Sequence, residues 1–144
     1  MGLLNLSANY PSQQYAETLA AGLIELSKHD GPYLAHCIEG KDRTGFVCIL
    51  LEALAGAAYD ELQADYMASF ANYYGITKES DPDKYQVISD LYLDGMLGFL
   101  AGVDEDAEDV DLHSLTYSGP ARRYLLGGGM TEGQADALVA RLVG

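Results

Sequence analysis

The sequence YLAHCIEGKDRTG, residues 33–45, decides the fold of this chain. Its first five residues begin apolar and lie between a Gly-Pro pair and a Glu-Gly pair, which predicts one buried strand over residues 33–37. From Arg43 or Thr44 to about Ala55, apolar residues occupy more than one helical face and predict a deeply buried helix. A cysteine at a strand end, five intervening residues and an arginine at a helix start predict a loop that binds an anion.

The residues around Cys37 favour a nucleophilic thiolate. The positive end of the following helix and the two-pronged donor of Arg43 stabilise negative charge, so the thiolate is favoured over the thiol. Thr44 can donate its hydroxyl to the thiolate, and Gly40 permits the sharp turn of the loop. We expect His36 to orient the loop through side-chain hydrogen bonds.

The backbone of the loop supplies the other ligands for the anion. We expect inward-facing N–H groups from six consecutive residues: Ile38, Glu39, Gly40, Lys41, Asp42 and Arg43. The Lys41 side chain either binds a second phosphate or is solvated, and both interpretations stay open. Cys48 lies on the apolar helix, 11 residues beyond Cys37, and is assigned to the core.

Helices are predicted on both sides of the loop. Apolar spacing predicts a helix over residues 11–28, with Ser12 as its N-cap. Three more helices are expected, over residues 59–74, 81–100 and 131–143. We therefore expect a single domain over residues 1–144, of the α/β class but mostly helical.

One strand cannot form a sheet, because its backbone donors and acceptors would stay unpaired. Weaker strands are therefore considered at residues 3–6 and 112–117. The acidic stretch 104–111 is expected to be a solvated loop, since it lacks the ligand order of a calcium-binding hand.

Composition excludes several classes of protein. The 144 residues carry 8 Lys and Arg against 22 Asp and Glu, a formal charge of −14 that disfavours nucleic acid and anionic membranes as partners. No apolar run is long enough for a membrane helix, and no signal peptide is visible. A cytoplasmic location is therefore expected, and secretion by a route that uses no visible signal peptide stays open. Two cysteines make neither a disulfide framework nor a metal site.

The motif His-Cys-x-x-Gly-Lys-Asp-Arg-Thr-Gly, residues 36–45, resembles the signature loop of the cysteine-dependent protein tyrosine phosphatases, in the form found in bacterial enzymes that also act on phosphoinositides. Asp65-Tyr66-x-x-Ser69 is similar to a pattern on the helix that follows the signature helix in that family. Glu39 departs from the small residue frequent there and puts a negative charge near the mouth of an anion site.

This resemblance implies a phosphatase-like fold in which residues ahead of the cysteine form most of a central sheet. Here 36 residues precede Cys37, so the chain looks like the C-terminal part of such a domain. We accordingly expect one or few strands of the sheet within this chain. Its open strand edge would be completed by a further N-terminal segment or by a second copy.

The resemblance also implies a mechanism without metal or cofactor. Cys37 would attack phosphorus to give a cysteinyl-phosphate, Arg43 and the loop amides would hold the phosphate oxygens, and Thr44 would support the departing thiolate. Asp42 is the candidate proton donor, although a role in bonding loop amides is equally open. The expected substrates are phosphorylated proteins (phosphotyrosine, with phosphoserine or phosphothreonine also considered) or phosphoinositides.

Three alternatives are considered at this point. A nucleotide-binding P-loop fails, because the required glycine at position 35 is alanine and Asp42 follows Gly40-Lys41. A sulfurtransferase also places a cysteine in an anion-binding loop, but the residues flanking Cys37 and Arg43 favour a phosphatase. A non-catalytic fragment or phosphate-binding module stays open.

Overall fold

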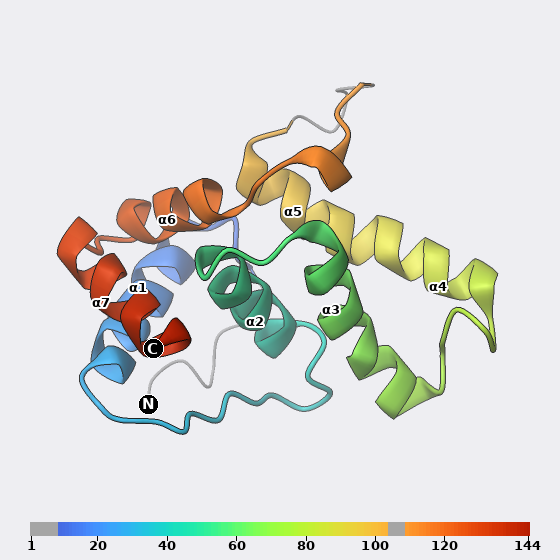
Figure 1. Cartoon of the computed structure of the whole chain (residues 1–144), viewed down its shortest axis with the longest axis horizontal. Helices are drawn as coiled ribbons and strands as arrows, with labels where there is room; N and C mark the ends of the chain where they lie inside the picture. The colour runs from blue at the N-terminus through green and yellow to red at the C-terminus, as the bar shows by residue number, and fades with distance from the viewer. Residues whose placement is uncertain (1–8, 104–108) are drawn as a thin grey trace.

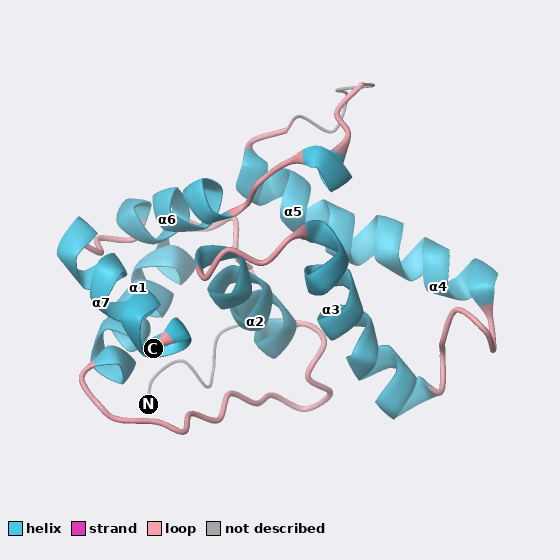
Figure 2. Ribbon diagram, viewed as in Figure 1, coloured by secondary structure: helices cyan, strands magenta, loops and turns pink. Residues whose placement is uncertain are grey.

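The computed structural model describes residues 9–103 and 109–144, and over these residues the chain contains helices and loops but no strand (Figure 2). The helices are α1 (Gln13–Ser27), α2 (Arg43–Leu54), α3 (Tyr59–Tyr74), α4 (Pro82–Ile88), α5 (Asp94–Ala101), α6 (Ser118–Gly127) and α7 (Glu132–Val143). A π-helical turn, Ser89–Leu93, joins α4 to α5. None of the described helices is long and apolar enough to cross a membrane.

Helix α2 lies between two groups of helices (Figure 1). On one side α1, α6 and α7 pack together, and on the other α3 packs against α2 and against the turn between α4 and α5. Phe46 of α2 is fully buried, and its ring stacks on Tyr10 with 4.5 Å between ring centroids. The edges of Tyr15 and Tyr124 meet the same ring, so one aromatic cluster joins α1, α2 and α6.

The predicted helices are confirmed, with outer boundaries within two residues, but the helix predicted over residues 81–100 is divided into α4 and α5 by the π-helical turn. Ser12 caps α1, since its Oγ accepts a hydrogen bond from the Tyr15 N–H at 3.1 Å. Helix α3 covers the predicted residues 59–74 without change. Thr131 caps α7 through a capping box with Gln134. Capping depends on residues within one turn and amphipathic spacing on residues within one helix, so the sequence alone was sufficient to predict these helices.

The predicted buried strand over residues 33–37 is not present in this structure. The segment is extended and runs along the surface between α1 and α2, and the Leu34 side chain is 87% exposed. The physical reason is the absence of a neighbouring strand within the described residues, because an extended segment becomes a strand only through inter-strand hydrogen bonds. Completion of a sheet by a further segment or a second copy stays a prediction.

Residues 112–117 also differ from prediction. In place of a weak strand the chain forms a 3₁₀ turn, Leu112–Ser114, and the buried Tyr117 donates its hydroxyl to the Leu112 carbonyl at 2.6 Å. The other weak strand, residues 3–6, lies outside the described residues, as do residues 104–108 of the acidic stretch.

Helix α6 was not predicted from the sequence. Its first turn contains Gly119 and Pro120 and three glycines follow Leu126, so the segment looks like a loop. Proline is nevertheless tolerated in a first helical turn, and Ala121 and Leu125 bury one face of α6. Gly128 allows the end of α6 to approach α1, since a Cβ there would lie 2.4 Å from the Ala16 carbonyl oxygen.

Candidate active site

The signature loop joins the extended segment to the N-terminus of α2. Gly40 has φ +77°, a left-handed conformation that side chains disfavour, and this confirms the predicted sharp turn. Gly45 lies against the Tyr66 ring of α3, where a Cβ would come within 3.0 Å of the ring. Ser69, one turn further along α3, lies next to Gly40. The two motifs noted in the sequence are therefore brought together.

Cys37 carries the most informative electrostatics of the loop. Burial opposes its ionisation, but hydrogen bonds from the Thr44 hydroxyl and from the backbone N–H groups of Thr44, Gly40 and Glu39 outweigh that effect. Together they lower the pKa of Cys37 to about 7. The Gly40 N–H donates to Cys37 Sγ at 3.3 Å. The thiol is thus poised to ionise near neutral pH, which is the property of a nucleophile.

Alkylation of Cys37 by iodoacetamide is expected to accelerate with pH and to reach half its maximal rate near pH 7, because only the thiolate reacts. Cys48 is an internal control, since burial and the nearby Glu52 and Asp65 raise its pKa to about 11. Peptide mass spectrometry over a pH series measures both sites. A half-point for Cys37 near the ordinary thiol value of about 8.5 would contradict the assignment.

Arg43 and Cys37 line one cavity of about 650 Å³. Arg43 is the first residue of α2, so its backbone N–H belongs to the positive end of that helix. The rest of the lining comes mainly from apolar side chains of α1 and α2, including Leu23, Val47 and Leu51. The candidate nucleophile and the predicted phosphate ligand therefore share a largely apolar cavity, a setting that strengthens electrostatic interactions.

Three charged side chains gather at the edge of the loop. Lys41 Nζ donates to the two carboxylate oxygens of Asp42 at 3.0 and 3.2 Å and lies 3.6 Å from Glu39 Oε2. Asp42 is the N-cap residue of α2, but its side chain makes no capping hydrogen bond. Its side chain is 52% exposed. The expected alternative role of Asp42, bonding loop amides, therefore finds no support in its contacts.

Two predicted site residues lie on the surface, although His36 still lines the cavity that contains Cys37 and Arg43. The His36 and Ile38 side chains are exposed, and within the described part of the chain the His36 side chain makes no hydrogen bond. The expected orienting hydrogen bonds of His36 are thus not formed here. The extended segment runs along the surface, so the His36 imidazole has no hydrogen-bond partner among the described residues.

Sequence reasoning missed two contributions from α3. The Tyr74 hydroxyl donates to Glu39 Oε2 at 2.6 Å, which ties the end of α3 to the loop. Burial and a hydrogen bond with Asp65 raise the pKa of Glu52 to about 8, and this contact joins α2 to α3. Asp65 belonged to the motif already noted, but nothing local in the sequence pairs it with Glu52.

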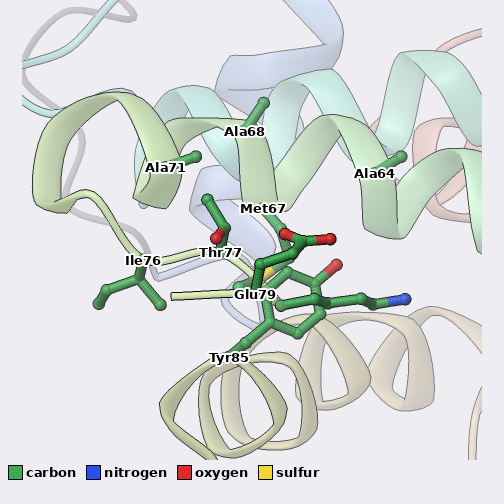
Figure 3. Close-up of a pocket in the computed structure, with 9 residues that line it drawn as sticks. Ala64, Met67, Ala68, Ala71, Ile76, Thr77, Glu79 and Tyr85 are labelled. Atoms are coloured by element: carbon green, nitrogen blue, oxygen red, sulfur yellow. The ribbon is translucent and has the colours of Figure 1, made fainter. Parts of the chain in front are cut away.

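A second, smaller cavity lies between α3 and α4 (Figure 3). It has a volume of about 250 Å³ and is lined by Ala64, Met67, Ala68, Ala71, Ile76, Thr77, Lys78, Glu79 and Tyr85. Lys78 Nζ lies 5.4 Å from the centroid of the Tyr85 ring. None of the loop residues 36–44 lines this cavity, so it is separate from the candidate active site.

Known relatives of the chain are phosphatases by name. A Cupriavidus necator protein whose provisional name is tyrosine-protein phosphatase is 37% identical over 67 residues, which cover 46% of this chain and 24% of that protein. The triple specificity protein phosphatase PtpB of Mycobacterium tuberculosis is 37% identical over 60 residues (42% and 22%). A tyrosine-protein phosphatase of Nostoc commune is 42% identical over 55 residues (38% and 19%).

The matched stretch thus spans about a quarter or less of each of these relatives. No solved structure matches the chain significantly. The model of the tyrosine phosphatase family matches residues 3–144, which is nearly the whole chain. Because the family model matches nearly the whole chain, which has a cysteine of lowered pKa and an arginine at the start of a buried helix, this chain belongs to the tyrosine phosphatase family.

Proposed function

We propose that the chain carries the catalytic loop of a phosphatase that hydrolyses phosphate monoesters through a cysteinyl-phosphate intermediate. The observation that carries this proposal is the thiol of Cys37, whose pKa is lowered to about 7 by the Thr44 hydroxyl and by loop amides at the start of α2. Phosphoryl transfer to a cysteine requires its thiolate and is aided by a cationic ligand for the phosphate, and Arg43 lines the same cavity.

In the first step Cys37 Sγ attacks phosphorus in line, and the bond between phosphorus and the leaving oxygen breaks. The leaving oxygen takes a proton from Asp42, the acid nearest to Arg43 in the loop. The Arg43 guanidinium and the N–H groups of residues 38–43 hold the other phosphate oxygens, where negative charge develops. Water then attacks phosphorus, the S–P bond breaks, and Asp42 recovers its proton. Thr44 stabilises the departing thiolate.

The chain is expected to hydrolyse p-nitrophenyl phosphate without added metal, and vanadate is expected to inhibit it by occupying the loop as a phosphate analogue. Release of nitrophenolate in the presence of EDTA measures both effects. Activity that needs an added divalent metal would contradict the covalent mechanism. Binding of phosphate without turnover would instead support a non-catalytic phosphate-binding module, an alternative favoured by the exposed segment ahead of Cys37.

Asp42→Asn is expected to lower kcat about 10²-fold for an alkyl phosphate, whose leaving oxygen needs a proton. With p-nitrophenyl phosphate the loss should be several-fold smaller, because nitrophenolate leaves without one. Comparison of kcat for the two substrates in both proteins measures the difference, with exposed Asp83→Asn of α4 as a matched control. An equal loss on both substrates would assign Asp42 to loop structure.

The proposed substrates are phosphotyrosine peptides and, with them, phosphoserine or phosphothreonine peptides and phosphoinositides. The relatives' names support the first class, and the name of the M. tuberculosis relative, which includes triple specificity, makes broader specificity worth testing. Lys41, at the edge of the loop, is the group that would meet a second phosphate. Nucleic acid is not among the proposed partners. The proposed activity does not require stable insertion of the chain into a membrane.

A further inference from the structure

Glu39 makes two contacts at the edge of the signature loop with one carboxylate oxygen. Its Oε2 accepts a hydrogen bond from the Tyr74 hydroxyl at 2.6 Å and lies 3.6 Å from Lys41 Nζ. The Glu39 side chain is 31% exposed, so the carboxylate lies partly beneath the surface. A single carboxylate therefore links α3 to the cation next to the phosphate loop.

Tyr74 donates to this carboxylate from the C-terminal end of α3. It is the last residue of α3, and its ring stacks on the buried Phe70 with 6.0 Å between centroids. The ring of Tyr73 meets Tyr74 edge-on at 4.9 Å. Tyr74 is 49% exposed, so its contact with Phe70 and its hydrogen bond to Glu39, rather than burial, orient the hydroxyl toward the carboxylate beside Lys41.

Lys41 consequently lies between two carboxylates. Its ammonium donates to Asp42 on one side and faces Glu39 on the other, and its side chain is only 22% exposed. A second phosphate on the substrate, carrying up to two negative charges, could reach Lys41 only by displacing one carboxylate or by lying close to it. Either route costs electrostatic energy that a substrate with one phosphate does not incur.

We propose that Glu39 is a specificity-determining residue, which lowers the preference of the site for substrates that carry a second phosphate beside the one to be cleaved. The proposal rests on the proposed phosphatase function and adds to it a substrate class that the loop disfavours. Tyr74 acts as the positioning residue for Glu39. The Lys41 ammonium is therefore already paired with two carboxylates of the protein, those of Glu39 and Asp42, before a substrate binds.

Equilibrium binding in a Cys37→Ser background tests this without turnover. The probes are inorganic phosphate and a short-chain phosphatidylinositol bisphosphate with adjacent ring phosphates, measured by calorimetry. Glu39→Gln keeps the size of the side chain and an acceptor for Tyr74 but removes the charge. It is expected to tighten binding of the bisphosphate about fivefold, the upper range for one exposed ion pair, and binding of phosphate less than twofold.

Two further variants separate this role from a general effect of charge. Glu17→Gln makes the same change on the exposed face of α1 and should leave both affinities within about 1.5-fold. Tyr74→Phe keeps the charge of Glu39 but frees its position, so a gain smaller than that of Glu39→Gln is expected for the bisphosphate. The proposal would be overturned if Glu39→Gln increased the affinity for both probes equally, or for neither. It would also be overturned if the chain bound neither probe.

Kinetics then distinguish this proposal from the function on which it rests. If the chain with Cys37 intact hydrolyses neither p-nitrophenyl phosphate nor the bisphosphate, the phosphatase proposal fails, while the binding ratio still decides the role of Glu39. If it hydrolyses both, Glu39→Gln should raise the ratio of kcat/KM for the bisphosphate to that for p-nitrophenyl phosphate by a similar factor. An unchanged ratio would overturn the specificity role alone.

Discussion

Cys37→Ser is expected to lower kcat/KM for p-nitrophenyl phosphate by at least about 10³-fold, the largest loss of any single substitution in this chain. The serine hydroxyl does not ionise near neutral pH, so the loop amides and the Thr44 hydroxyl would no longer have a thiolate to stabilise. Steady-state nitrophenolate release measures the loss. Trapping the acid-quenched intermediate by mass spectrometry should show phosphate on Cys37 in the unmodified chain.

Cys48→Ser is the matched control for this substitution. Cys48 lies on α2, and burial, Glu52 and Asp65 raise the pKa of its thiol to about 11, so it holds no thiolate at neutral pH. Its replacement by serine should leave turnover within about threefold. Activity that persists in Cys37→Ser, or that disappears only in Cys48→Ser, would contradict the assignment of the nucleophile.

Arg43→Lys is expected to reduce kcat about 10²- to 10³-fold while leaving the charge of the site unchanged, because an ammonium cannot hold two phosphate oxygens at once. Lysine at this position still begins α2, so the fold should survive. The exposed Arg123→Lys on α6 is the control and should cost almost nothing. Measured kcat with unchanged far-ultraviolet circular dichroism checks the expectation; full activity in Arg43→Lys would refute a bidentate role.

The helices and the chemistry of the loop were accessible from the sequence because both depend on residues close together in the chain. Ser12 caps α1 within one turn, and the glycine at position 40 takes its left-handed conformation inside the loop itself. The groups that lower the pKa of Cys37 come from residues 39, 40 and 44. Spacing within a segment of eight residues is therefore enough to indicate a candidate nucleophile and the groups that lower its pKa.

Strand structure was not accessible, because the same residues 33–37 can be a strand only beside a partner. Apolar composition predicted burial for Leu34, whereas the side chain lies on the surface in a chain whose described residues contain no strand. Helix α6 was missed for a related reason. Its glycines and proline disfavour a helix locally, and packing of Ala121 and Leu125 against the core overrides that preference.

The sequence by itself indicated the family signature, the candidate nucleophile Cys37 and the order of the described α-helices other than α6, since each depends on short-range spacing. Only the tertiary structure decided how that loop is supported. Tyr74 is 35 residues from Glu39, and Glu52 meets Asp65 only because α2 packs on α3. Contacts of this kind depend on the relative placement of helices, and burial of Phe46 and its aromatic neighbours fixes that placement by removing apolar surface from water.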